Sequence, residues 1–302
     1  MLVSACRSSM SGVDGGSAGS RGGSTGGSGG AGPGGAGGAT GLAGVTGSGG
    51  GAAGTTGAGG GTAGTTGAGG MSGATGAAGG GGGPAFDCLG RSLPTTAPLT
   101  FTMTGGVNTN RSGVLPGATV TAVDINGTTL LNNLNPVVAT TGDLGIFRLD
   151  FMTQGTPLDL HLVITKTGQL DTFWYPPAPF AGPYNTNGLD SFTASELDFL
   201  LPSADVTRDN TKSIVIVIVV DCARTRVSGA TIATTPAAGA MRYWASGSLS
   251  TTATATSTAG EAFFLNMPPG DVMVSAAWNG SVLRSHHVTA VAGAVTEALV
   301  GP

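Results

Sequence analysis

The sequence predicts an all-β protein, in which two tandem β-sandwich domains follow a long Gly-rich N-terminal segment. Three observations support this prediction: short runs of alternating apolar residues, Gly- and Pro-containing turns between them, and few charged side chains. About two-thirds of the 57 glycines precede Pro84 in the chain of 302 residues. The remaining part, about 215 residues, is long enough for two sandwiches of roughly 100 residues each.

The first six residues resemble the end of a bacterial lipoprotein signal, because Leu2-Val3-Ser4-Ala5 precedes Cys6. In such a signal the Cys becomes the lipidated N-terminus, and two acyl chains give stable membrane anchoring. The basic region and the apolar stretch of a complete signal are missing. We therefore interpret residues 1–6 as a truncated signal remnant with Cys6 as the lipidation candidate; the alternative is that Cys6 is incidental.

Residues 7–84 are a low-complexity stretch of Gly, Ala, Ser and Thr, and the decamers at 51–60 and 61–70 are near-copies. This repeat has only Ala and Thr to stack, so it does not predict a solenoid. The composition cannot bury enough apolar surface to offset the entropy of ordering. We expect a disordered linker whose root-mean-square span is about 50 Å.

The first domain is predicted to cover residues 85–205. Thr193 and Glu196 have the spacing of a capping box, which predicts a short helix from Ala194 to Leu201 that ends at Pro202. The strands are predicted from period-2 alternation at residues 99–103, 118–125, 146–151, 158–164 and 169–175, with another that begins at Val137.

The second domain is predicted to cover residues 206–302. Residues 214–220 are seven consecutive β-branched residues, which predict a strand covered on both faces. Further strands are expected at residues 229–234, 241–245, 251–256, 281–288 and 294–300.

The stretch Gly260–Gly280 is the most informative part of the second domain. Pro268-Pro269-Gly270 predicts a turn between two strands, because Pro cannot continue a central strand and Gly permits a positive φ. Asn279-Gly280 then predicts a two-residue hairpin turn.

The two domains repeat a common pattern. Leu115-Pro116-Gly117-Ala118-Thr119-Val120 corresponds to Val227-Ser228-Gly229-Ala230-Thr231-Ile232, and Thr141…Gly145-Ile146-Phe147 corresponds to Thr256…Gly260-Glu261-Ala262-Phe263. With the Pro-Pro-Gly turn, this pattern resembles the carboxypeptidase regulatory-like family. The first domain lacks that turn, and both domains lack the family's Asp after Thr.

The resemblance implies seven-stranded, transthyretin- or immunoglobulin-like Greek-key sandwiches without catalytic activity. Modules of this family accompany enzymes or receptors and support, space or bind. The whole arrangement also resembles predicted bacterial surface lipoproteins that carry paired modules on a Gly-rich stalk.

Cys88 and Cys222 are a disulfide candidate. If Cys6 is lipidated, these two form an even pair in an oxidising compartment. A bridge between them closes a loop of roughly 130 residues and is worth about 4–5 kcal/mol in the chain-entropy model. The alternative is a pair of unbridged, small hydrophobic side chains.

The composition excludes several classes of function. The net charge of −4 with only 12 Lys and Arg leaves no basic face for nucleic acid. No phosphate-binding loop, dinucleotide fingerprint or nucleophile elbow is present, so we expect no cofactor, no catalytic residues and no enzyme activity. Adjacent His286 and His287 point to opposite faces of a strand, so with His161 they are interpreted as surface or rim residues rather than metal ligands.

A Pro-rich loop concentrates several of the scarce aromatic residues. Its candidate ligand-binding residues are Trp174, Tyr175, Phe180 and Tyr184. Exposed rings beside Asn and Asp side chains could stack on a sugar. The alternative is that the loop folds over one end of the sandwich and its rings cap the core.

These observations predict a non-enzymatic, tethered structural or interaction module at the outer surface of a bacterial cell envelope, or secreted from it. The alternative is an accessory carbohydrate-binding module that presents the aromatic loop. The expected partners are a glycan or protein ligand and a membrane reached only through the lipid anchor. The oligomeric state is left open.

Overall fold

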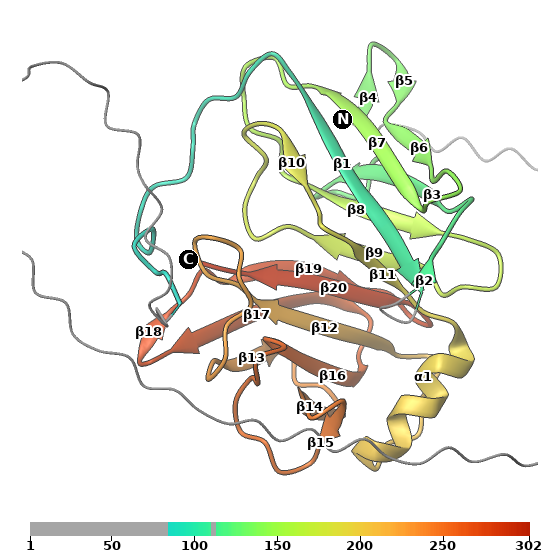
Figure 1. Ribbon diagram of the computed structural model, residues 1–302, viewed down its shortest axis with the longest axis vertical. Coiled ribbons are helices and arrows are strands. Elements are labelled where there is room, and N and C mark those ends of the chain that lie inside the picture. Colours follow the sequence, from blue (N-terminus) through green and yellow to red (C-terminus); the bar gives the residue numbers. More distant parts are fainter. Residues whose placement is uncertain (1–83, 110–112) are drawn as a thin grey trace, which may run out of the picture. The chain divides into compact units, whose positions relative to one another are not determined.

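The computed structural model describes residues 84–109 and 113–302, and strands make up most of the regular structure there (Figure 1). Three sheets and a small hairpin are built around three clusters of buried apolar side chains. The all-β sandwich fold predicted from the sequence is therefore confirmed. The expectations for residues 1–83, including Cys6 and the linker, lie outside the described residues.

The first sheet is organised around β1, its longest strand. β7 pairs with β1 antiparallel, while β10 and β11 pair in parallel with successive parts of its other edge. The strands of this sheet are β1 (Thr100–Thr109), β2 (Gly113–Val114), β7 (Ile146–Met152), β10 (Tyr184–Asn185) and β11 (Leu189–Ser191).

The second sheet has nine strands, in the order β15-β14-β16-β12-β20-β9-β8-β3-β6. Its strands from the first predicted domain are β3 (Thr119–Asp124), β6 (Val138–Thr140), β8 (Leu160–Thr165) and β9 (Thr172–Tyr175). Its strands from the second are β12 (Ser213–Val219), β14 (Ala240–Ala245), β15 (Ser248–Ser250), β16 (Glu261–Met267) and β20 (Val295–Val300).

The third sheet packs against the second half of the nine-stranded sheet. β17 lies at its centre and pairs antiparallel with the other three strands. The strands are β13 (Thr231–Thr235), β17 (Gly270–Trp278), β18 (Ser281–Val282) and β19 (His286–Ala290). The separate small hairpin is formed by β4 (Leu131–Asn132) and β5 (Asn135–Pro136).

The two halves of the nine-stranded sheet meet where β9 pairs in parallel with β20. The pairing places Trp174 opposite Glu297 and Tyr175 opposite Ala298, so main-chain hydrogen bonds continue from one half into the other. β9 contributes to both halves, because Trp174 packs in the core of the first sandwich while Phe173 and Tyr175 pack against that of the second. The sequence-based boundary at residues 205 and 206 stays a prediction.

β12 is buried along its whole length, as its β-branched sequence predicts. One set of alternating side chains, Val215, Val217 and Val219, joins the core of the second sandwich. The other set, Ile214, Ile216 and Ile218, packs with residues of a short helix and its neighbours. The expectation that both faces of this strand are covered is therefore confirmed.

The covering helix is α1 (Ala194–Leu200). Thr193 and Glu196 form the predicted capping box: the Thr193 hydroxyl accepts from the Glu196 N–H at 3.1 Å, and the Glu196 carboxylate accepts from the Thr193 N–H at 2.6 Å. Pro202 does not stop the chain from coiling. Leu201–Ala204 continues as a 3-10 turn, η1, because Pro fits the first turn of such a helix. No helix within the described residues is long and apolar enough to cross a membrane.

Three sequence expectations for the second half are refined by the structure. Pro268-Pro269-Gly270 does join two strands, but β16 and β17 belong to different sheets, so the turn carries the chain from one sheet to the other. The strand expected at residues 251–256 is wrong, since only Ser248–Ser250 is extended there. The strand expected at residues 281–288 is divided into β18 and β19.

Candidate functional site: the anchor at Cys88 and Cys222

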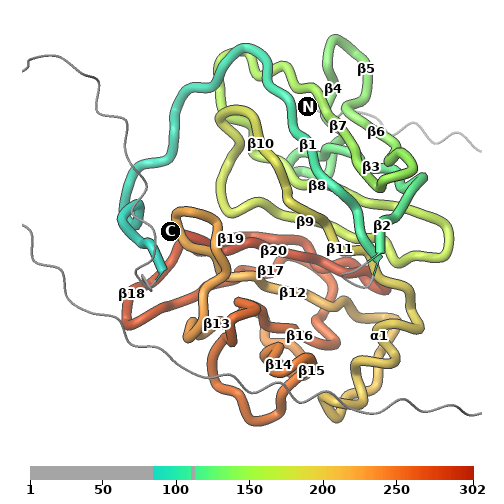
Figure 2. The backbone as a smooth tube through the Cα atoms, in the orientation of Figure 1, coloured from blue at the N-terminus to red at the C-terminus, as the bar shows by residue number. Residues whose placement is uncertain are grey.

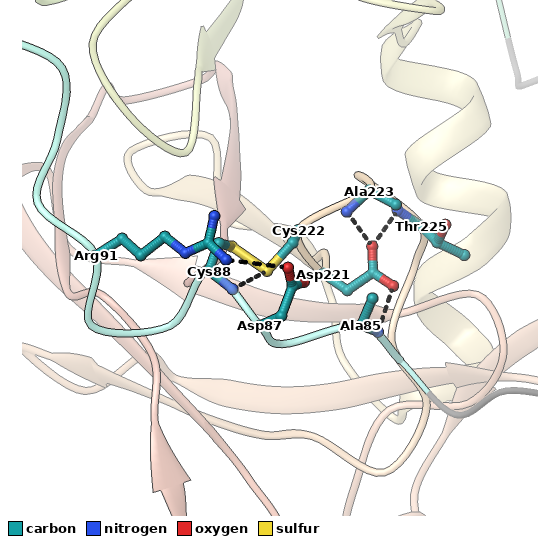
Figure 3. Close-up of a disulfide and its surroundings, with 8 residues drawn as sticks. All are labelled: Ala85, Asp87, Cys88, Arg91, Asp221, Cys222, Ala223 and Thr225. Atoms are coloured by element: carbon teal, nitrogen blue, oxygen red, sulfur yellow. Dashed lines mark hydrogen bonds and ion pairs between the residues drawn. A yellow bond between two sulfur atoms is a disulfide. The ribbon is translucent and has the colours of Figure 1, made fainter. Parts of the chain in front are cut away.

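A disulfide attaches the start of the described chain to the second sandwich. Cys88 and Cys222 are bonded across 134 residues, with their Cα atoms 5.8 Å apart, a separation normal for a disulfide (Figure 3). Cys88 lies in a turn in which the Leu89 N–H donates to the Phe86 carbonyl at 3.0 Å. Cys222 lies just beyond the end of β12. The bridge therefore joins the N-terminal segment to the turn after β12, an interior strand of the nine-stranded sheet.

Asp221 organises the backbone around the disulfide. The residue is 6% exposed, and its carboxylate accepts three main-chain N–H groups: Ala223 at 2.9 Å, Thr225 at 2.8 Å and Ala85 at 3.0 Å (Figure 3). The Cys222 N–H returns a bond to the Ala85 carbonyl at 2.9 Å. The buried charge is thus offset by oriented donors, two from its own turn and one from the incoming segment.

Aromatic stacking adds to this attachment. The Phe86 ring lies 4.7 Å from the Trp278 ring at an interplanar angle of 29°. Trp278 ends β17, and its indole N–H donates to the Ser228 carbonyl at 3.0 Å. Figure 2 shows the segment before β1 starting near β18 and then running to the first sandwich. The N-terminal segment therefore covers part of the second core before it enters the first.

The candidate ligand-binding residues of the Pro-rich loop lie together, but not as an exposed surface. Trp174 is 1% exposed and Phe180 is 3% exposed, and both belong to the core of the first sandwich. The Tyr184 ring meets the Phe180 ring edge-on, with centroids 4.7 Å apart. Tyr175 is also buried, and its hydroxyl accepts from the Thr289 N–H at 3.1 Å. These rings fill and cap the core, as the alternative interpretation of the loop predicts.

Tyr184 is the member of this group with a cation beside it. The guanidinium carbon of Arg224 lies 4.0 Å from the centre of the Tyr184 ring, which is a cation–π arrangement. Burial raises the pKa of Tyr184, and the nearby Arg224 charge opposes this in part. This contact joins the Pro-rich loop to the turn that contains Cys222. A cavity of about 320 Å³ borders the disulfide between the two.

His161 is not the surface or rim residue that the sequence suggested. It is 5% exposed, stacks on Tyr175 with centroids 4.6 Å apart, and has a buried Nδ1 without a hydrogen-bond partner. Burial lowers its pKa to about 4, while the Asp124 charge acts in the opposite direction. The reason for the correction is that Tyr175, at the join of the two sandwiches, covers the sheet face on which His161 lies.

His286 shares a neighbour with His161, because its ring meets the Tyr175 ring edge-on with centroids 6.0 Å apart. The His286 ring hydrogen-bonds the Pro176 carbonyl, and the exposed His287 ring lies 3.1 Å from an Asp271 oxygen. Within residues 84–109 and 113–302, no three His, Cys, Asp or Glu side chains are grouped as metal ligands would be.

Three parts of the anchor were not found from the sequence: Asp221, the Phe86–Trp278 stack and the Arg224–Tyr184 contact. Asp221 does carry a local signal, because an Asp before a turn often accepts the N–H two residues later. The two ring contacts join residues far apart in sequence, and no local pattern reports them.

Comparisons with known proteins give no family assignment. No protein-family model matches the chain, and no curated protein matches it. Solved structures with some similarity include the Bacillus anthracis TIE protein, at 11% identity and a TM-score of 0.23, over 67% of this chain and 34% of that one. The chain thus spans about a third of the length of the TIE protein.

Two further solved structures show similarity at the same low level. A mutant of the shaft pilin SpaA from Lactobacillus rhamnosus GG has 9% identity and a TM-score of 0.21, over 69% of this chain and 98% of that one. The 3-chlorocatechol 1,2-dioxygenase from Rhodococcus opacus 1CP has 15% identity and a TM-score of 0.24, over 37% and 68%. At these TM-scores the similarities establish neither a shared family nor a shared function.

Proposed function

We propose that this chain is a non-enzymatic structural or interaction module of the cell envelope, in which the Gly-rich N-terminal segment tethers a disulfide-clamped pair of β-sandwiches outside the cytoplasm. The observation that carries the proposal is the Cys88–Cys222 bridge together with its supporting contacts. Structural disulfides persist in oxidising compartments and are rare in the cytosol, which supports a location beyond the membrane.

The position of the bridge suits a tether. Tension that arrives through the N-terminal segment passes at Cys88 into Cys222, beside the end of β12. The 133 residues between the two cysteines form a covalently closed loop that this tension does not stretch. The first sandwich lies inside that loop, so it remains folded and free for contacts while the tether is loaded.

The buried polar groups also support a structural role rather than a catalytic one. Asp221 is occupied by main-chain donors. Glu261, which is 1% exposed, is paired with Arg226, and the same guanidinium donates to the Ala259 carbonyl at 2.9 Å. His161 is stacked in the interior. These side chains hold loops and sheets together, which is the work expected of a display module.

The location is tested in the organism that encodes the protein, with an antibody against residues 84–302. Protease treatment of intact cells is expected to remove the full-length chain, while a cytosolic marker protein remains as the control. A protein found only in the cytosol, with both cysteines open to thiol labelling before reduction, would overturn the proposal. Measurable turnover by the full chain on ester, peptide or glycoside substrates would overturn its non-enzymatic part.

The same proposal assigns Cys6 the role of lipid acceptor and the two sandwiches a place among carboxypeptidase regulatory-like modules. Metabolic labelling with an alkyne fatty acid tests the first point. The wild-type chain is expected to carry the label and the Cys6→Ser variant is not, whereas equal labelling of both contradicts it.

A further inference from the structure

A second cavity, distinct from the disulfide anchor, lies where the two sandwiches meet. Its volume is about 490 Å³, within the range of small-molecule sites. Apolar side chains from several parts of the chain line it, with Leu93 from the N-terminal segment, Tyr175 and Pro177 from the end of β9 and the loop after it, and Val288 from β19. Residues far apart in sequence therefore build one concave surface.

Arg284 is the unusual member of this lining. Its Nε atom is buried and has no hydrogen-bond partner, and none of the ion pairs within the described residues includes it. The chain holds it in place, because the Arg284 N–H donates to the Gly301 carbonyl at 3.0 Å. A buried donor without a partner carries the full cost of losing its water, so this side chain in a cavity lining would be stabilised by an acceptor from outside the chain.

The other described arginines show that this state is exceptional. Four of them pair with carboxylates: Arg91 with Asp87, Arg148 with Asp150, Arg208 with Asp198, and Arg226 with Glu261. Arg224 lies over the Tyr184 ring and Arg242 donates to the Ala204 carbonyl. Among the described arginines, Arg284 is the one that lines a cavity and has a buried Nε without a hydrogen-bond partner.

The walls of the cavity are fixed before any ligand arrives. The Tyr175 hydroxyl accepts from the Thr289 N–H at 3.1 Å, which ties β9 to β19. The His286 ring bonds the Pro176 carbonyl, which holds the Pro-rich loop against the same strand. A ligand that enters such a site loses little free energy in ordering the protein.

We propose that this cavity binds a carboxylate that carries an apolar body, with Arg284 as the residue that receives the carboxylate. The planar guanidinium matches a carboxylate and gives a strong, charge-assisted pair in a partly apolar site. A doubly charged phosphate is disfavoured, because Asp159 and Asp271 also line the cavity and repel a dianion. The apolar walls suit an aliphatic or aromatic body. The carboxylate comes either from a free organic acid or from the C-terminus of a peptide, and both present the same group.

Calorimetric titration of the full chain with benzoate tests the proposal, with neutral benzamide as the matched ligand. Benzoate is expected to bind and benzamide to bind at least about tenfold more weakly, as the loss of a charged hydrogen-bonding partner implies. Arg284→Met removes the guanidinium but keeps much of the apolar length of the side chain. This variant should bind benzoate at least about tenfold more weakly than the wild type does. Arg148→Met, on the exposed face of β7, is the control and should bind benzoate as the wild type does.

A second variant guards against a folding defect in Arg284→Met. Asp271 is exposed, and Asp271→Asn removes a negative charge from the rim, so benzoate should bind a few-fold more tightly. A short peptide that ends in Phe, as free acid and as amide, separates the two sources of the carboxylate. If the peptide acid binds more tightly than benzoate, the site is assigned to peptide C-termini. If benzoate binds more tightly, the site is assigned to free organic acids. Three outcomes overturn the proposal. Benzoate and benzamide bind equally, or benzoate binds to Arg284→Met as it does to the wild type, or benzoate does not bind at 20 mM, which is about the weakest affinity that a single charged pair would give.

Discussion

Thr141 and Thr256 make the same pair of side-chain hydrogen bonds, one in each sandwich. The Thr141 hydroxyl accepts from the Ala118 N–H at 2.9 Å and donates to the Leu115 carbonyl at 2.6 Å. Thr256 makes the corresponding two bonds at 2.9 and 2.7 Å. Both threonines are buried, and their hydroxyls close the turns that lead into β3 and β13. The repeat seen in the sequence is therefore also a repeat of specific contacts.

Replacing either threonine with valine should destabilise the protein by about 1–3 kcal/mol, because the change leaves a buried N–H and a buried carbonyl without partners. Thr→Ser at the same positions keeps the hydroxyl and should cost less. The free energy of unfolding from urea denaturation measures the effect. Thr251→Val, at an exposed site, is the control and should stay within about 0.5 kcal/mol. Equal stability of all these variants would show that the hydroxyls are not needed.

Gly145 and Gly260 are the second element of the repeat, and each has a positive φ, of 69° and 68°. A Cβ at Gly145 would lie 2.8 Å from the Val107 carbonyl oxygen, so Gly145→Ala combines left-handed strain with a backbone clash. We expect a loss of about 2–4 kcal/mol in unfolding free energy. Gly117 has the same φ of 69° but nothing within 4 Å, so Gly117→Ala should cost only about 1 kcal/mol. Equal losses for the two variants would rule out the clash.

Local patterns in the sequence were sufficient for most of the fold. Alternation predicts β8, because Leu160, Leu162 and Ile164 do face one core. The Thr193–Glu196 spacing predicts α1, because a capping box involves only neighbouring residues.

The parts that could not be predicted depend on contacts distant in sequence. Alternation placed His161 on the face opposite Leu160 and Leu162, but it cannot show that Tyr175 would cover that face. The burial of the aromatic rings could not be decided from the sequence for the same reason. Trp174 and Phe180 belong to a Pro-rich stretch of the sequence, but in the structure both rings lie in the core.

Removal of the disulfide should lower stability substantially. A bridge between residues 134 apart is worth up to about 5 kcal/mol in the chain-entropy model. We expect the Cys88→Ser/Cys222→Ser variant to unfold at lower denaturant concentration, and proteases to cut residues 84–98 first. Asp221→Asn, with the bridge intact, is the comparison that separates the covalent link from the hydrogen bonds. Modification of both cysteines by a thiol reagent in unreduced, folded protein would contradict the bridge.

His161 should make stability depend on pH. Its pKa is lowered from 6.5 to about 4 by burial, so between these values the unfolded chain binds a proton that the folded chain does not. The contribution of His161 to the free energy of unfolding is therefore at its maximum above about pH 6.5. It falls as the pH drops to about 4, by a total on the order of 2 kcal/mol.

His161→Phe keeps the stacking on Tyr175 but removes the proton-binding group, so its unfolding free energy should vary less over this range. Phe151→Leu, in the core of the first sandwich and outside this stack, is the control and should lose stability equally at all pH values. Asp150, whose pKa is lowered by the Thr102 hydroxyl and Arg148, acts below this window, since its ordinary pKa is 3.8. An unchanged pH profile in His161→Phe would show that another group is responsible.

Trp174 decides between a core and a binding role for the aromatic loop. Its ring is buried beside Phe180 and Tyr184, so Trp174→Ala should leave a cavity and cost about 3–5 kcal/mol of unfolding free energy. Phe199→Ala is the matched control, because this ring is 83% exposed on α1 and its removal should cost no more than about 0.5 kcal/mol. A Trp174→Ala protein of wild-type stability that has lost binding to a glycan array would reverse the assignment and return the ring to a binding surface.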